Sequence, residues 1–116
     1  MANTYKNEKL DLTAATATTL YTAPTNARAI IKSILVCDDT NSGSDITVTL
    51  YPGDPGAGGG IVLFKNKVIT ANATNQLISQ PLIMQENEVL EVVAADANRL
   101  HITASLLEIS RDDQNG

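Results

Sequence analysis

The sequence predicts an all-β fold: a single-domain antiparallel β-sandwich, jelly-roll-like, with about eight short strands. Three observations lead to this prediction. Apolar residues alternate with threonines at Ile46, Val48 and Leu50, which is typical of a strand with one buried face. Turn-forming residues separate such stretches at spacings near the roughly 8–12 residues of sandwiches and barrels. No stretch shows a convincing amphipathic helix pattern.

Length and composition limit the chain to one domain and exclude one class of partner. The 116 residues leave room for a single core. Hydrophobic residues make up 43% of the chain but aromatic residues only 3%, so Leu, Ile, Val and Ala must fill that core. The net charge is −5 and the eight Lys and Arg are scattered, which argues against nucleic acid as a partner. We expect an N-terminal arm at 1–9, the sandwich domain at 10–109 and a polar C-terminal tail at 110–116.

A β-hairpin is predicted at the centre of the sandwich. Its strands are Ala29–Cys37 and Asp45–Tyr51, and Asp38–Ser44 joins them. The first strand has few polar positions, as expected where both faces are covered. The connection is rich in Asp, Asn, Ser and Gly, which turn a chain and tolerate left-handed dihedral angles.

The remaining strands follow from shorter patterns. Ala14–Thr18 is open to helix, but its threonines favour extended chain. A turn or a bulge is expected at Lys65–Lys67. In the last strand either a bulge intervenes before Leu107 or both faces are buried. The expected strands are Leu10–Thr13, Thr19–Thr22, Ile61–Ile69, Leu77–Ile78 and Leu82–Met84 around Pro81, Val89–Val93 and Leu100–Ile109. The expected core residues are Ile30, Ile34, Val48, Leu50, Leu90, Val92, Ile102 and Leu106.

Pro52–Gly60 is predicted to be a long mobile loop, because prolines and glycines dominate it. A glycine-rich loop can bind phosphate, but this one lacks the Gly-Lys-Ser/Thr ending of a P-loop and no helix follows it. A surface loop that contacts a partner is the better interpretation. The residues expected to contact a partner are Tyr5, Tyr51, Pro52, Gly53, Asp54 and Pro55.

Residues suited to metal binding or catalysis form no complete site in the sequence. Asp38, Asp39, Asn41 and Asp45 have the oxygen ligands of a calcium loop, but their spacing is loose and the Glu of an EF-type loop is missing. They are also ordinary turn residues. His101 has no second histidine and no nucleophile motif with which to form a zinc site or a triad.

The other reactive residues also have simpler interpretations. Cys37 ends an apolar strand and is expected to pack as a small hydrophobe. Asn72-Ala73-Thr74 matches a glycosylation sequon by chance, and the glutamates at 86, 88 and 91 are expected on a solvated face. We therefore predict no catalytic residue, no cofactor and no metal, and a protein that is not an enzyme.

The N-terminal ten residues contain no apolar segment of a secretory signal. No apolar run approaches the roughly 20 residues that span a bilayer, so no membrane partner is expected. One cysteine fits synthesis in a reducing cytoplasm. The product is expected to be either a soluble intracellular protein or a virion component assembled inside a cell.

A series of motifs runs along the chain from Leu10 to Ile109. In order they are Leu10–Leu12, Thr19–Pro24, Ala29–Ile34, Ile46–Leu50, Leu63–Asn66, Pro81–Met84, Glu88–Val92 and Ala104–Ile109. In this order the motifs resemble those of small β-sandwich virion proteins of tailed bacteriophages, of the capsid decoration or cement type.

The resemblance implies a structural protein of the virion, made in the host cytoplasm. A capsid decoration (cement) protein would bind the outer shell and stabilise it, and a tail, neck or fibre-associated protein is the alternative. The implied partners are further copies of the chain, with a trimer expected, and the major capsid protein or other virion proteins. The resemblance carries no catalytic signature and assigns no role to an individual residue.

Both ends of the chain are polar, so neither can become ordered by burial against its own domain. We therefore expect at least one terminus to lie against a neighbouring subunit as an arm. Tyr5 is the expected anchor of the N-terminal arm.

Overall fold

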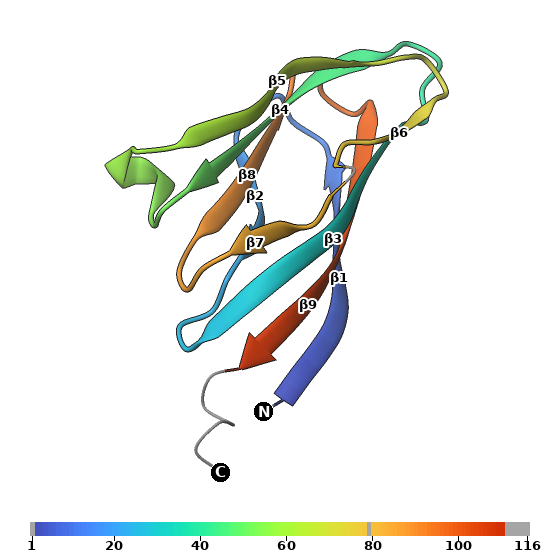
Figure 1. Cartoon of the computed structure of the whole chain (residues 1–116). Coiled ribbons are helices and arrows are strands. Elements are labelled where there is room, and N and C mark those ends of the chain that lie inside the picture. Colours follow the sequence, from blue (N-terminus) through green and yellow to red (C-terminus); the bar gives the residue numbers. More distant parts are fainter. Residues whose placement is uncertain (1, 79, 111–116) are drawn as a thin grey trace.

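Two antiparallel sheets pack face to face in the computed structural model of the chain, which describes residues 2–78 and 80–110 (Figure 1). This confirms the predicted all-β sandwich. One 3-10 turn, η1 (Pro55–Ala57), interrupts the strands. The strands are β1 (Ala2–Leu12), β2 (Thr18–Thr22), β3 (Ala27–Asp38), β4 (Ser44–Tyr51), β5 (Ile61–Ile69), β6 (Thr74–Gln76), β7 (Leu82–Met84), β8 (Val89–Ala94) and β9 (Leu100–Ser110).

The strand order is that of a jelly roll. Sheet A has the order β1-β9-β3-β6, with β7 also paired to β3, and sheet B has the order β2-β8-β4-β5. The pairs are nested: β1 with β9, β2 with β8, β3 with β6 and β7, and β4 with β5. A long hairpin that is rolled into two sheets has this pairing.

The predicted central hairpin is wrong. The strand β3 pairs with β9, β6 and β7, whereas β4 pairs with β8 and β5 in the other sheet. The segment between β3 and β4, residues 39–43, is therefore an arch that crosses from sheet A to sheet B. Turn residues dictate that the chain reverses, but partners distant in the sequence decide which sheet the next strand joins.

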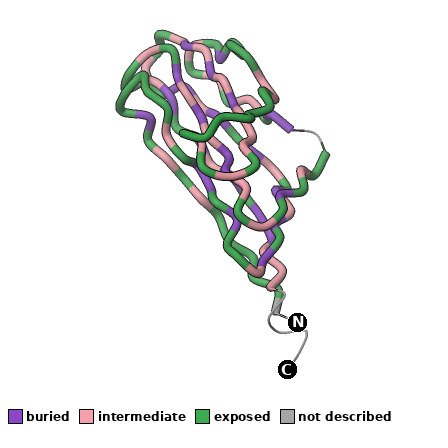
Figure 2. Tube along the Cα trace, turned by 90° about the vertical axis from the view of Figure 1, so that its left-hand side faces the viewer, coloured by how far each residue is buried: buried purple, intermediate pink, exposed green. Residues whose placement is uncertain are grey.

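Most of the predicted core is buried between the sheets. Ile34, Val48, Leu90, Val92, Ile102 and Leu106 have at most 2% of their surface exposed. Ile30 and Leu50 are only half-buried. Figure 2 shows buried and exposed residues alternating along the strands.

A bulge in β3 explains the exception at Ile30. The register with β9 shifts between Ile31 and Ser33. Before the shift Ala29 and Ile31 are buried, and after it Ile34 and Val36 are buried. The extra residue reverses the alternation, so Ile30 and Ile34 do not share a face although they are four residues apart.

The structure decides between the alternatives left by three local patterns. The register of β5 with β4 shifts across Lys65–Lys67, and Asn66 has φ 51°, so this segment is a bulge. The strand β9 pairs with β1 without a shift, and both Leu106 and Leu107 are buried, so both faces are covered there. Residues 13–17 form a loop between β1 and β2 rather than a helix.

Two predicted segments have another form in the structure. Leu77 and Ile78 are buried but do not form a strand, and the short β6 precedes them. The predicted arm at 1–9 lies, from residue 2 on, in β1, which pairs with β9 along its whole length. Ladder hydrogen bonds replace the burial that the polar sequence lacks. Residues 111–116 of the predicted C-terminal tail lie outside the described residues.

Candidate functional site

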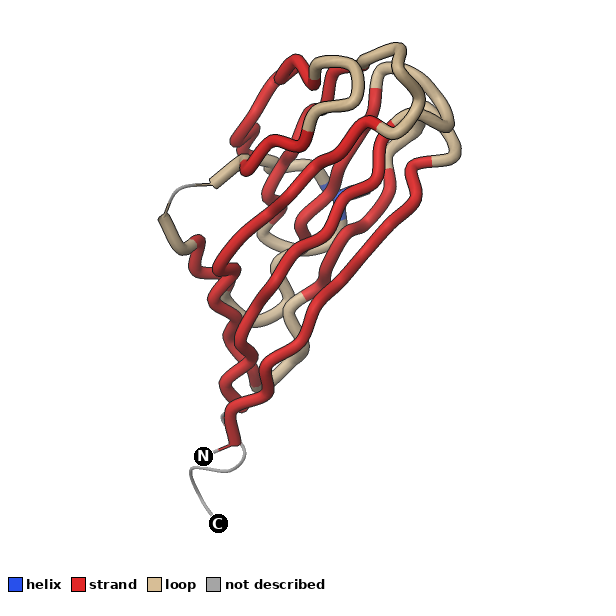
Figure 3. Tube along the Cα trace, turned by 90° about the vertical axis from the view of Figure 1, so that its right-hand side faces the viewer, coloured by secondary structure: helices blue, strands red, loops and turns tan. Residues whose placement is uncertain are grey.

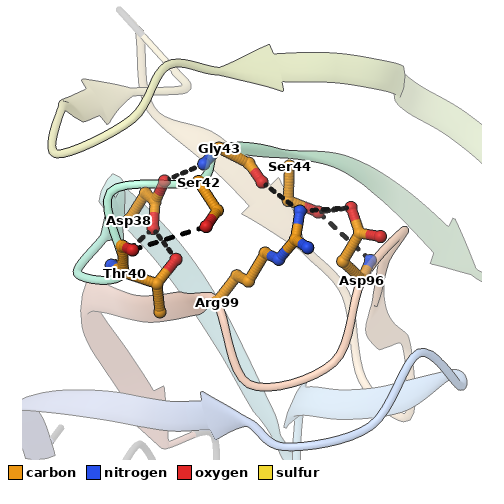
Figure 4. Close-up of polar contacts among 7 residues, drawn as sticks. All are labelled: Asp38, Thr40, Ser42, Gly43, Ser44, Asp96 and Arg99. Atoms are coloured by element: carbon orange, nitrogen blue, oxygen red, sulfur yellow. Dashed lines mark hydrogen bonds and ion pairs between the residues drawn. The ribbon is translucent and has the colours of Figure 1, made fainter.

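The arch between β3 and β4 is built around one buried carboxylate (Figure 4). Asp38 is 1% exposed. Its Oδ1 accepts hydrogen bonds from the Thr40 amide at 2.8 Å and the Thr40 hydroxyl at 2.7 Å, and its Oδ2 accepts one from the Gly43 amide. The hydrogen bonds from the Thr40 hydroxyl and amide and from the Gly43 amide hold the pKa of Asp38 below its ordinary value.

A second group of polar side chains ties the arch to the turn between β8 and β9. Arg99 donates a hydrogen bond to the Gly43 carbonyl at 3.0 Å and lies 3.4 Å from Asp96. The Ser44 hydroxyl donates to Asp96 at 3.0 Å and accepts from the Asp96 amide at 3.1 Å. In Figure 4 these side chains converge from both turns. The contacts hold the two sheets in register at this end of the sandwich.

The residues of the calcium-loop alternative do not converge on one point. Asp38 turns into its own arch, and Asn41 accepts a hydrogen bond from Asn72 at 2.6 Å. Asp39 lies 3.8 Å from His101 on the outer side of sheet A. Within residues 2–78 and 80–110, no three His, Cys, Asp or Glu side chains are grouped as metal ligands. The arrangement therefore supports the turn interpretation of these residues.

His101 lies on the outer face of sheet A between two carboxylates. Its Nε2 is 3.3 Å from Asp11 of β1 and 3.8 Å from Asp39, and the imidazole is half-exposed. The register also places Cys37 of β3 opposite His101. Sequence reasoning missed this row because the three strands meet only in the folded sheet. The two contacts connect β1 and β9 to the arch.

The other candidate residues take part in turns. Glu86 accepts a hydrogen bond from the Asn26 amide at 2.7 Å, and Glu88 accepts one from the Gln85 amide at 2.7 Å. Asn72 has φ 61° in the turn before β6. Asparagine tolerates this left-handed conformation better than most residues.

A polar cluster lies at the edge of the core beside β1. The Tyr21 hydroxyl donates to Glu108 at 2.6 Å, and burial together with this carboxylate raises the pKa of Tyr21. The Lys6 ammonium lies 3.4 Å from both Glu108 and Glu8, and 5.8 Å from the centre of the Tyr21 ring. The cluster joins β1 and β9 of sheet A to β2 of sheet B.

The loop from Pro52 to Gly60 has a defined conformation. The Asp54 side chain accepts a hydrogen bond from the Gly56 amide at 2.9 Å, which caps η1. A Cβ added at Gly60 would lie 2.6 Å from the Tyr51 ring and 2.7 Å from the Thr49 methyl group. Glycine is therefore needed at position 60 for packing. The predicted mobility of this loop stays a prediction.

The structure does not bring the predicted contact residues together. Tyr5 lies on β1 at one border of sheet A, and Tyr51, Pro52, Gly53, Asp54 and Pro55 lie at the end of β4 beside β5, a border of sheet B. In the sandwich β1 faces β2, whereas β5 lies at the opposite side of the molecule (Figure 1). These residues therefore belong to two separate surfaces.

Exposed apolar side chains mark both surfaces. On the outer face of sheet A, Tyr5 is 74% and Ile83 is 61% exposed, and the register puts them in one row with Leu107 and Ile30. On β5, the exposed residues are Ile61, Val62 and Val68. Alternation along β5 does not separate Ile61, Val62 and Val68 from core residues such as Ile69, because their burial depends on strands that are distant in the sequence.

Comparison with known proteins identifies similar folds but does not assign the chain to a family. No protein-family model matches the sequence, and no curated protein matches it. The described part of the chain contains no helix long and apolar enough to cross a membrane.

Three solved structures illustrate the shared fold. A chain of the T13 particle of infectious bursal disease virus has 15% identity and a TM-score of 0.55, over 91% of this chain and 30% of that chain. A Bacillus endospore appendage, described as a disulfide-linked pilus, has 13% identity and a TM-score of 0.57, over 94% of this chain and 87% of that chain. A chain of the bursal disease virus Gx strain has 15% identity and a TM-score of 0.50, over 90% of this chain and 33% of that chain.

These similarities define the class of the protein as a jelly-roll β-sandwich. This chain spans about a third of the length of each of these two viral chains. At such low identity the likeness concerns the fold alone. Jelly rolls occur in viral capsids, and also in lectins and cupins.

Proposed function

We propose that this chain is a structural virion protein of a tailed bacteriophage, a capsid decoration (cement) protein that binds the outer shell and stabilises it. The observation that carries the proposal is the exposure of Tyr5 and Ile83 on the outer face of sheet A and of three residues on β5, Ile61, Val62 and Val68. Clustered exposed apolar side chains mark surfaces that contact other proteins. Two such surfaces suit a protein that binds its own copies on one side and a shell on the other.

The chemistry of the described residues supports a structural role. The carboxylates of Asp38, Glu86 and Glu88 accept hydrogen bonds from backbone amides of turns. Lys6 lies in an ion pair that connects β1 and β9, and His101 of β9 lies 3.3 Å from Asp11 of β1. Such contacts stabilise the fold and leave these side chains engaged within it. The resemblance to phage virion proteins directs the proposal to the capsid.

A tail, neck or fibre-associated protein is the second candidate. The similarity to a spore appendage over 87% of that chain favours it, because it shows a jelly roll of this size in a protein described as a pilus. The elongated shape of this chain, 51 × 28 × 22 Å, also suits a subunit stacked along a filament.

The location and copy number of the chain in purified particles test the proposal. Quantitative mass spectrometry would compare its copies with those of the major capsid protein. A cement protein is expected in hundreds of copies, and a small ring-like number would favour the tail or neck. A chain that is not in particles at all would refute both candidates. Sedimentation equilibrium tests the trimer expected from the resemblance.

A further inference from the structure

Among the strands that border the two sheets, β1 is the longest and the most regular. It contains 11 residues and pairs with β9 without a shift. By contrast, β2 has 5 residues and a bulge, and β6 and β7 have 3 residues each. The register of β5 shifts twice, and Lys65 and Lys67 lie in the strand. Short length, bulges and lysines prevent edge strands from pairing with other chains, and β1 lacks the first two of these devices.

The charges of β1 are balanced, although the chain as a whole carries −5. Lys6 and Lys9 offset Glu8 and Asp11 within the strand. A second copy that approaches this edge therefore meets a locally neutral surface rather than the repulsion of two acidic proteins. Figure 3 shows the side of the molecule on which β1 lies in Figure 1, where the long strands of sheet A run side by side.

We propose that two copies of this chain pair antiparallel along β1, on a two-fold axis that passes through Asn7. Asn7 is the middle residue of Ala2–Leu12, so this register lets the whole strand pair with its copy. Two sheets A then form one continuous sheet, and the exposed backbone N–H and C=O groups of both edges become paired.

The charges in this register are complementary. Lys6 lies opposite Glu8 of the second copy, and Glu8 lies opposite Lys6 of the second copy. Residues directly opposite in an antiparallel pair share a face of the sheet, so these side chains meet. Within one chain Lys6 already lies 3.4 Å from Glu8. The four side chains therefore form a cluster in which positive and negative charges alternate, and in each copy Glu108 lies beside it, 3.4 Å from Lys6.

Neighbouring registers lose this complementarity. An axis moved by one residue passes through Lys6 or Glu8, which then lies opposite its own copy. Like charges directly opposite each other destabilise a strand pair. Each such shift also shortens the paired length by two residues at the ends. Maximum overlap and charge complementarity thus coincide at Asn7.

The proposed pairing assigns a role to Tyr5. In this register Tyr5 lies opposite Lys9 of the second copy, on the outer face of sheet A. An ammonium beside a tyrosine ring makes a favourable cation–π contact. Tyr5 is 74% exposed in the single chain, so it is available for this contact.

The inference rests on the self-association part of the proposed function and makes it specific. A trimer contact would have to use a surface other than the edge of β1, and together the two contacts would give an even-numbered assembly. The location of the chain in particles and the register of β1 are measured separately. A negative result for the location in particles therefore does not refute the β1 pairing, and a negative result for the pairing does not refute the location.

Disulfide cross-linking tests the register directly. Cys37→Ser removes the native thiol, and Asn7→Cys places one new thiol on the proposed axis. Opposite Cα atoms in antiparallel strands are about 4.5–5.5 Å apart, within the range that a disulfide bridges. Asn3→Cys in the same background is the matched control, because two Asn3 positions would lie about 27 Å apart, eight residues along the strand pair.

The expected result is a covalent dimer of Asn7→Cys under mild oxidation, and no dimer of Asn3→Cys. Circular dichroism checks that both variants are folded. Folded Asn7→Cys protein that stays monomeric would overturn the proposal, as would cross-linking of Asn3→Cys to the same extent.

Charge reversal tests the proposed pairs. Glu8→Lys would place four lysines together at the axis, whereas Glu91→Lys on β8 changes the net charge equally but lies away from β1. Sedimentation equilibrium should show an even number of copies for the native chain and for Glu91→Lys, with a dimer where the β1 contact alone forms. For Glu8→Lys the Kd should rise about tenfold or more, and less so at high salt. Equal Kd values for the two variants would refute the pairing. A native chain that shows no dimers at about 100 μM would also refute it, because at this concentration even a Kd of about 100 μM gives a measurable fraction of dimer.

Discussion

Ile30 and Ile31 are adjacent in β3 but lie on opposite faces of sheet A. Replacing each of them by Ala therefore tests which face of β3 is buried. Ile31 is 0% exposed, and the register places it between Leu106 and Leu82. Ile30 is half-buried on the outer face between Leu107 and Ile83. Both substitutions remove the same atoms and the same β-propensity, so their difference measures burial alone.

The expected costs follow from the two environments. A fully buried Ile replaced by Ala loses its transfer free energy and leaves a cavity, which together cost about 2–5 kcal/mol. Ile31 is surrounded on both sides, so Ile31→Ala should lie in the upper half of this range. At Ile30 water can occupy the space, and we expect a loss of about 0.5–1.5 kcal/mol. The two free energies of unfolding should therefore differ by about 2 kcal/mol or more.

Urea denaturation at one protein concentration measures this difference, because association of folded copies would otherwise add to stability. With an m value of about 1–3 kcal/mol/M, the midpoints should differ by roughly 1 M. Equal stabilities of the two variants, within about 0.5 kcal/mol, would refute the bulge at Lys32 and the inward side assigned to Ile31. A larger loss for Ile30→Ala would reverse the faces of β3.

Three further predictions concern turns. The lowered pKa of Asp38 means that its stabilising contribution is fully present above the ordinary pKa of 3.8 and is lost as the pH falls through the lower folded value. Thermal unfolding against pH should therefore show a larger loss in the native chain than in Asp38→Asn, in which only the other carboxylates titrate. Gly60→Ala should destabilise the chain by about 1–3 kcal/mol in urea, because its Cβ would collide with Tyr51, whereas Gly53→Ala, with open space around it, is the control. Asn98 has φ 61°, a left-handed conformation that glycine adopts freely and valine does not. The free energy of unfolding of Asn98→Gly should therefore stay within about 0.5 kcal/mol of that of the native chain, whereas Asn98→Val should lose about 1–2 kcal/mol. Equal losses for the two variants would exclude the left-handed conformation.

Local patterns predicted the parts of the candidate surfaces but not their arrangement. Tyr5 and Tyr51 were both expected to contact a partner, and sheet order places them at opposite sides of the sandwich. The ion pair between His101 and Asp11 joins residues 90 positions apart in the sequence, so no motif indicates it. Asp38 was open to a calcium role until the hydrogen bonds of the arch accounted for its oxygens.

The sequence by itself determined the class of fold and most of the core. Period-two alternation at Ile46 and Val48 commits a segment to a strand with one buried face, whatever its neighbours are. The polar, aromatic-poor composition and the asparagine-rich turns are likewise properties of the chain alone.

Only the tertiary structure decided which strands are neighbours. The turn residues of Asp38–Ser44 are equally compatible with a hairpin and with an arch between sheets, and the choice depends on β9 and β8, more than 40 residues away. The face of Ile30 depends on a bulge that the pairing with β9 imposes. Strand pairing is non-local, and the edge of β1 is open only because no later strand of the described chain takes the place beside it.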